Sequence, residues 1–146
     1  MKTALYIEEM DKFISMITNE GMSVIGCSDE QIKNLENDFG VLPQFYIIFL
    51  KRMGISAGSF KIESWFFYKD VHGINEETRA LMEENNVSPP DNMFAFLMHQ
   101  GYTSLFFIKS ADPDPAVYSY TEGAETADIN LTFSQFMKAE INDFCQ

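Results

Sequence analysis

Two apolar stretches in the second half of the chain constrain the fold most strongly. Residues 93–98 (MFAFLM) and 105–108 (LFFI) are continuous apolar runs of strand length, separated by a short polar stretch. This pattern predicts a β-hairpin. The turn-rich residues 112–115 (DPDP) then lead to residues 117–120, which predict a third strand. Short connections between successive strands favour a largely antiparallel sheet.

Helical patterns lie on both sides of these strands. Ser28 and Gln31 form a capping box at the start of one predicted helix, and Thr132 with Gln135 forms another at the start of the last helix. Apolar spacing and helix-breaking residues define the remaining boundaries. The helices predicted in this way cover residues 6–17, 28–39, 43–53, 75–86 and 132–144.

The whole chain, residues 1–146, is therefore expected to form one domain of the α+β class. Its largely antiparallel sheet would be covered by N-terminal and C-terminal helices. Phe, Lys and Ile alternate at 60–62, which predicts a further short strand. The state of residues 63–72 stays open.

The charge balance limits the kinds of partner. The chain has 22 acidic and 10 basic residues, and its formal net charge is -12. A surface this negative repels nucleic-acid phosphates and anionic membranes, so neither is an expected partner. It would attract a protein with a basic surface and speed their encounter. Solubility alone accounts for the charge equally well.

The start of the chain indicates where the protein works. Glu8 and Glu9 follow the first residues closely, so no signal-peptide apolar region precedes them. No apolar run approaches the length of a membrane span. Cys27 and Cys145 are far apart and belong to no CxxC pair. These features predict a reducing cytoplasm in which both thiols are free.

One motif has the form of a catalytic site. Residues 54–58 (GISAG) fit the GxSxG nucleophile elbow of serine hydrolases. That elbow needs a strand entering the turn and a helix leaving it. Here a predicted helix ends at Gly54 and a predicted strand follows. The motif therefore favours a flexible turn, and a serine hydrolase acting through Ser56 is kept as an alternative.

No set of residues has the spacing of a metal or cofactor site. His72, His99 and the two distant cysteines lack the spacing of zinc ligands, and no phosphate-binding glycine motif is present. Asp112 and Asp114 could share a hard cation, but the proline after each one favours a rigid turn. We therefore expect no metal, no cofactor and no enzymatic activity.

A dense aromatic cluster occupies residues 65–68 (WFFY). Tryptophan and tyrosine are enriched at the energetic centres of protein interfaces, so Trp65 is a candidate partner-binding residue. Packing inside the core is the alternative for such a run.

Two stretches resemble the SUKH superfamily, the group around the yeast cell-wall-assembly regulator. The first, residues 28–54, contains IxxLExxFGxLPxxYxxFL, and the second, residues 89–137, contains PP, MFAF, HQG and DPxVYxYxEG in order. The resemblance implies an α+β fold. For bacterial members it also implies an immunity protein that binds and neutralises a cognate toxin, often a nuclease, of a polymorphic or contact-dependent system. The superfamily also contains regulators, so a regulatory interaction module without a toxin is an alternative.

The resemblance transfers no catalytic residue to this chain. A basic toxin would instead be met by acidic side chains in and after the turn-rich connection. Any one of these could equally be an ordinary solvated loop residue. The predicted partner-binding residues are Asp112, Asp114, Glu122, Glu125, Asp128 and Trp65.

Overall fold

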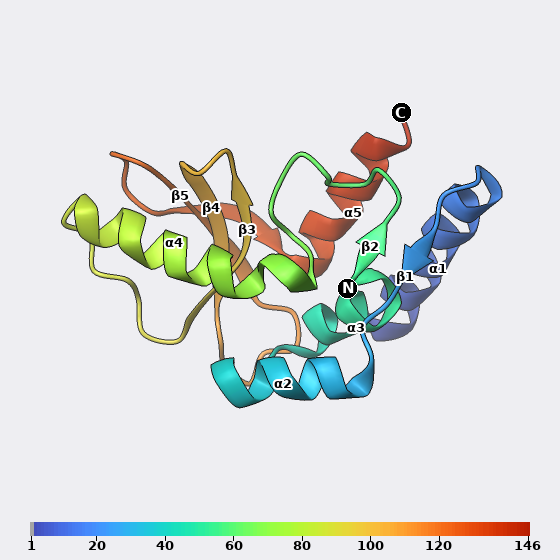
Figure 1. Cartoon of the computed structure of the whole chain (residues 1–146), viewed down its shortest axis with the longest axis horizontal. Helices are drawn as coiled ribbons and strands as arrows, with labels where there is room; N and C mark the ends of the chain where they lie inside the picture. Colours follow the sequence, from blue (N-terminus) through green and yellow to red (C-terminus); the bar gives the residue numbers. More distant parts are fainter. Residues whose placement is uncertain (1) are drawn as a thin grey trace.

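The chain forms helices and two short strands in its first half and a strand meander in its second (Figure 1). The computed structural model describes residues 2–146. Its α-helices are α1 (Thr3–Asn19), α2 (Asp29–Phe39), α3 (Gln44–Met53), α4 (Val71–Glu84) and α5 (Phe133–Phe144). Its strands are β1 (Val24–Ile25), β2 (Ser56–Ala57), β3 (Met93–His99), β4 (Thr103–Ile108), β5 (Ala116–Thr121) and β6 (Ala127–Thr132). A 3-10 turn, η1 (Tyr68–Asp70), leads into α4.

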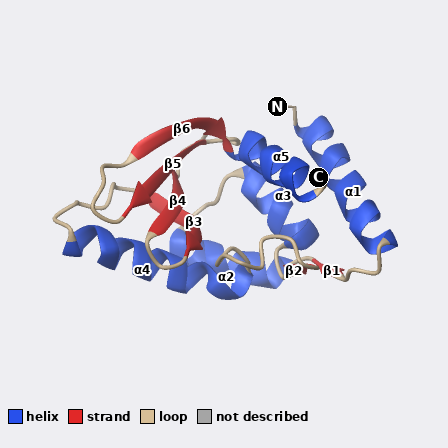
Figure 2. Ribbon diagram, turned by 90° about the horizontal axis from the view of Figure 1, so that it is seen from above, coloured by secondary structure: helices blue, strands red, loops and turns tan. Residues whose placement is uncertain are grey.

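The four later strands form one antiparallel sheet in the order β3-β4-β5-β6, and β1 pairs with β2 in a separate ribbon. Helix α4 lies along one face of the sheet, while α3 and α5 lie toward its other face (Figures 1 and 2). The predicted α+β class, with a largely antiparallel sheet covered by helices, is confirmed. The sequence predicted that terminal helices cover the sheet. In the structure the mid-chain helix α4 covers one face as well.

Strand β3 is apolar from Met93 to Met98 because both of its faces are covered. Phe94 and Phe96 belong to the main core, whereas Met93 and Ala95 belong to a smaller core beneath α4. Side chains alternate between the two faces of a strand, so an uninterrupted apolar run requires a layer on each side. Strand β4 alternates between the same two cores.

The main core joins the N-terminal helices, the sheet and the last helix. Tyr46 of α3 is fully buried, and its ring centroid lies 5.2 Å from that of Phe94 and 5.5 Å from that of Phe133. Helix α1 enters the same core through Tyr6, whose hydroxyl donates to the Phe45 carbonyl at 3.0 Å. Edge-to-face aromatic packing of this kind adds stability beyond the area buried.

Both predicted capping boxes are confirmed. Ser28 Oγ accepts from the Gln31 amide at 3.1 Å, while Gln31 Oε1 accepts from the Ser28 amide at 2.8 Å. Thr132 and Gln135 make the same reciprocal pair at the start of α5. Each box satisfies backbone donors that the first turn of a helix leaves unpaired.

The strand predicted at 60–62 is wrong, because these residues form a turn. Lys61 has a left-handed φ of 56°, which ends any extended conformation. Phe60 is fully buried and Ile62 is exposed, so the alternation that predicted a strand comes from a turn that places one side chain in the core. Helix α4 also begins at Val71, four residues before its predicted start.

Strand β6 was not predicted, although residues 127–132 (ADINLT) alternate apolar and polar residues as a half-exposed strand does. It is an edge strand in which three of six residues are exposed and the other three are half-buried. Asn130 adopts a left-handed φ of 62°, and its amide donates to Asp128 Oδ1 at 2.7 Å. The irregularity interrupts the pairing of β6 with β5 and makes this edge a poor template for a further strand.

The other edge strand, β3, is closed by hydrogen bonds rather than by a neighbouring strand. The buried side-chain amide of Asn75 on α4 accepts from the Ala95 amide at 2.8 Å and donates to the Ala95 carbonyl at 2.9 Å. Further along, Trp65 and Met98 exchange two backbone hydrogen bonds of 2.9 Å. One side chain and one loop residue thus satisfy the free edge of β3.

We expect Asn75→Ala to lower the free energy of unfolding by about 2–3 kcal/mol, because it leaves the buried amide and carbonyl of Ala95 without partners. Asn85→Ala is the matched control, since Asn85 makes one partly buried hydrogen bond to Leu81. Its cost should stay near 1 kcal/mol. Urea unfolding followed by circular dichroism measures both, and equal losses would contradict the assigned role of Asn75.

Candidate partner-binding site

Trp65 is an exposed aromatic residue whose backbone is fixed against the sheet. Its backbone is held against β3 by the two hydrogen bonds to Met98, while 47% of the residue is exposed. The next two residues, Phe66 and Phe67, point inward and are buried. Two residues of the aromatic cluster therefore belong to the core, and the indole of Trp65 stays at the surface.

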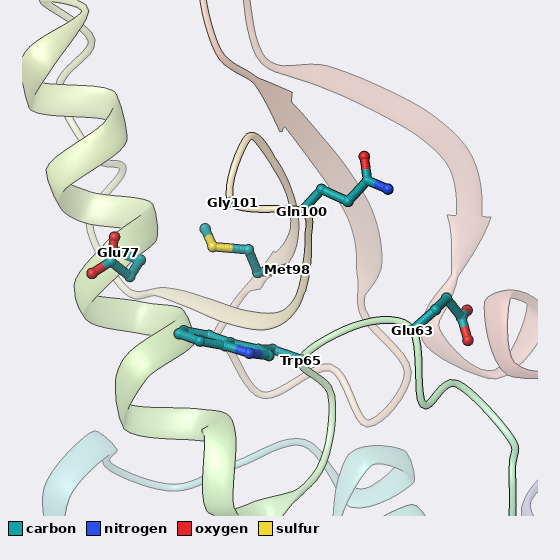
Figure 3. A pocket seen from close by; sticks show the side chains of 6 residues that line it. All are labelled: Glu63, Trp65, Glu77, Met98, Gln100 and Gly101. Atoms are coloured by element: carbon teal, nitrogen blue, oxygen red, sulfur yellow. The ribbon is translucent and has the colours of Figure 1, made fainter.

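The indole borders a cavity between the loop that carries it, helix α4 and the β3–β4 turn (Figure 3). The cavity has a volume of about 360 Å³. In Figure 3 the flat ring of Trp65 reaches toward α4, and the side chains of Glu77 and Met98 lie on one side of it. The lining residues are Glu63, Trp65, Glu77, Met98, Gln100 and Gly101.

A glycine on α4 allows the indole to lie close to the helix. A Cβ atom at Gly73 would lie only 3.2 Å from Cζ3 of Trp65. Glycine inside a helix costs about 0.5–1 kcal/mol relative to alanine, so the close approach is made at the expense of helix stability. Glu77 follows Gly73 by one turn on the same side of α4 and lines the same cavity as the indole.

The two carboxylates of the cavity have different surroundings. Glu63 lies 3.4 Å from the Lys61 ammonium and points away from the indole in Figure 3. A hydrogen bond from its own backbone, with a smaller contribution from Lys61, holds the pKa of the Glu63 carboxyl below its usual value. Glu77 forms no ion pair within residues 2–146. Its negative charge is therefore available to a ligand.

A second hollow of about 320 Å³ lies on the other side of Trp65. It includes the exposed side chain of Ile62 and the ribbon residue Ser56. The exposed side chains of Ile62 and Trp65 both line this hollow, and neighbouring apolar side chains are typical of the centre of a protein interface. We call the surface that joins both hollows through Trp65 the Trp65 face.

The geometry around Ser56 is that of a short ribbon. Helix α3 ends before it, Ser56 pairs with Ile25 of β1, and a turn follows at Gly58. A nucleophile elbow has the reverse order, strand then helix. Among the described residues, the two histidines pair elsewhere: His99 with Ser64 at 3.0 Å and His72 with Asp38 at 2.8 Å.

The predicted acidic residues do not come together at one place. Asp112 and Asp114 precede β5, whereas Glu122 and Glu125 follow it, so the six residues of β5 separate them. At about 3.3 Å per residue, that strand holds the two groups roughly 20 Å apart. Asp128 lies on β6.

Of these acids, Glu122 comes nearest to the Trp65 face. Its amide donates to the Tyr102 carbonyl at 2.8 Å, which places it beside the β3–β4 turn that lines the cavity. The partner-binding role of the acids and of Trp65 stays a prediction. Glu77 and Gly73 were not among the predicted residues, because nothing in a polar helical segment distinguishes one glutamate from its neighbours before Trp65 is placed against it.

Asp114 takes part in the internal hydrogen bonding of the fold. Its carboxylate accepts from the Ser134 amide at 2.8 Å, the Ser134 hydroxyl at 2.6 Å and the Thr132 hydroxyl at 3.0 Å. These bonds fasten the β4–β5 connection to the first turn of α5. A carboxylate at a helix N-terminus is also favoured by the helix dipole.

The described residues offer little else for chemistry. Within residues 2–146, no three His, Cys, Asp or Glu side chains gather closely enough to hold a metal ion. Both cysteines are free, and burial raises the pKa of the Cys27 thiol to about 11, which disfavours a nucleophilic thiolate at neutral pH. None of the helices in this range combines the length and the apolar character needed to cross a membrane.

One family model matches most of the chain. The model of the SMI1/KNR4 family (SUKH-1) matches residues 26–139, which run from the end of β1 into α5. Helix α1 lies outside the matched region although it packs into the same core. No curated protein and no solved structure matches the chain.

We expect Asp114→Ala to lower the free energy of unfolding by about 2–3 kcal/mol, because three hydrogen bonds at the start of α5 are lost. Glu125→Ala, at an exposed loop position, should change it by less than about 0.5 kcal/mol. Urea unfolding compares the two variants. A loss at Glu125 as large as that at Asp114 would contradict a structural role confined to Asp114.

Proposed function

We propose that this chain, which belongs to the SMI1/KNR4 family (SUKH-1), is a non-enzymatic immunity protein that binds a cognate toxin and neutralises it in the cytoplasm of the producing cell. Two observations support a protein-binding role: the match to the family model, and the resemblance of this chain to bacterial immunity members of the superfamily. The observation that carries the proposal is the Trp65 face, a built and exposed aromatic site with no catalytic constellation around it in residues 2–146.

The Trp65 face has the anatomy of a protein-binding centre. Tryptophan is the residue type most enriched among binding hot spots, and the indole is held in place by backbone hydrogen bonds. Ile62 adds exposed apolar surface next to it, and two carboxylates, Glu63 and Glu77, line the cavity beside it. An interface of this type desolvates its aromatic centre and keeps charged groups at the rim.

The overall charge supports a basic partner. A formal net charge of -12 attracts a toxin whose active surface is positive, as the nucleic-acid-binding face of a nuclease must be. Electrostatic attraction raises the association rate and favours basic partners over acidic ones. Covering or plugging that basic face would exclude the toxin's substrate, which neutralises it without any chemical step.

Growth and binding assays with the protein encoded by the adjacent gene test this function. The chain should rescue cells from that protein and form a complex with it. Trp65→Ala should weaken the complex by about 30-fold, or about 2 kcal/mol. Leu5→Ala is the matched control, because Leu5 on α1 is 46% exposed and should leave affinity within about twofold.

Salt dependence tests the electrostatic part. Raising the ionic strength from about 20 mM to about 500 mM should slow association by roughly tenfold or more and change dissociation little. An association rate that ignores salt would remove the electrostatic argument. Absence of both rescue and complex would contradict the immunity function, whereas a complex with a harmless neighbour would favour a regulatory interaction module.

A further inference from the structure

We propose that the cavity beside Trp65 receives an arginine side chain of the partner, with its guanidinium stacked on the indole and paired with the Glu77 carboxylate. The inference rests on the proposed function in one respect, that the natural ligand is part of a protein. It goes further by assigning a chemical class to the ligand and a role to Glu77, a residue on α4 that lines the same cavity as the ring (Figure 3).

The lining of the cavity selects a cation. Among the residues that line it in the described chain, two are carboxylates and none is basic. Glu63 is already paired with Lys61, whereas Glu77 forms no ion pair in residues 2–146. The face of an indole is electron-rich and attracts a cation placed over it. An anionic ligand would meet repulsion from both carboxylates.

Arginine fits this lining better than lysine. Its guanidinium is planar and weakly hydrated, so it stacks on an aromatic face and also donates to a carboxylate. Met98 provides an apolar wall on the same side of the ring as Glu77, and a polarizable thioether packs well against the methylene stem of a long side chain. An ammonium ion keeps its water more strongly and gains less from the flat ring.

The indole is preorganised for such stacking. Two backbone hydrogen bonds join Trp65 to Met98, and the far end of its ring lies against Gly73. A ring already held in its bound position loses little conformational freedom when a ligand arrives, which favours binding. The glycine in α4 thus has a functional explanation, since a larger residue would push the ring away from the helix.

The single tryptophan of the chain makes the test direct. Indole fluorescence and the indole N–H resonance both report on Trp65 alone. The full chain is titrated at low salt with the capped tripeptide Gly-Arg-Gly and with capped peptides in which arginine is replaced by citrulline or by lysine. Citrulline has nearly the shape of arginine but no charge, so it separates cation binding from simple contact with the ring.

We expect the arginine peptide to shift both signals in a saturable way, with a dissociation constant on the order of 10 mM for so small a probe. The lysine peptide should bind about threefold more weakly, and the citrulline peptide should bind at least about tenfold more weakly. Glu77→Gln should weaken arginine binding by about fivefold. Glu76→Gln is the matched control, since Glu76 is exposed on the same helix and does not line the cavity.

Three outcomes overturn the inference: no shift at about 100 mM peptide, equal shifts with arginine and citrulline, or equal effects of Glu77→Gln and Glu76→Gln. These results are separable from the proposed function. Toxin neutralisation that survives Glu77→Gln, with no response to the arginine peptide, would remove this inference and leave the immunity function intact. Selective arginine binding by a chain that neutralises no neighbouring protein would do the reverse.

Discussion

The burial of β3 on both faces is the constraint on which the rest of the structure depends. A strand covered by α4 on one side and by the aromatic core on the other leaves only the hydrogen-bonding groups of its free edge to be satisfied, and within residues 2–146 no further strand pairs with that edge. The side-chain amide of Asn75 and the backbone of Trp65 take that place. Buried backbone groups must find partners, so these contacts are required by the sheet itself.

The same requirement creates the candidate site. Because the loop before α4 must pair with Met98, Trp65 is held at the end of the strand with its indole directed along the surface toward the helix. Gly73 makes room for the ring, and Glu77 stands one turn further along. A surface aromatic residue thus acquires a fixed orientation and a charged neighbour from contacts that first of all stabilise the sheet.

Charge acts on a different scale from this local geometry. The net charge of -12 belongs to the whole surface and bears on how fast a basic partner arrives. The acidic residues predicted to bind the partner do not form one local site. Two of them precede β5 and two follow it, and the Asp114 carboxylate hydrogen-bonds to Ser134 within the fold. In the proposed immunity function, long-range attraction would favour toxins with a positively charged surface, and the Trp65 face would discriminate among those toxins.

The sequence by itself determined those helices and strands whose signals lie within a short stretch of the chain. Capping boxes, apolar periodicity and the hairpin of continuous apolar runs placed α2, α5, β3 and β4, because each of these signals acts within a few residues of the chain. Only the tertiary structure decided the turn at 60–62, the pairing of Trp65 with β3, and the position of its ring beside Gly73 in a cavity that Glu77 also lines. Those features depend on contacts between residues far apart in the chain. A local pattern could nominate Trp65 as a binding residue, but the ligand chemistry inferred for it comes from the side chains that folding brings around the ring.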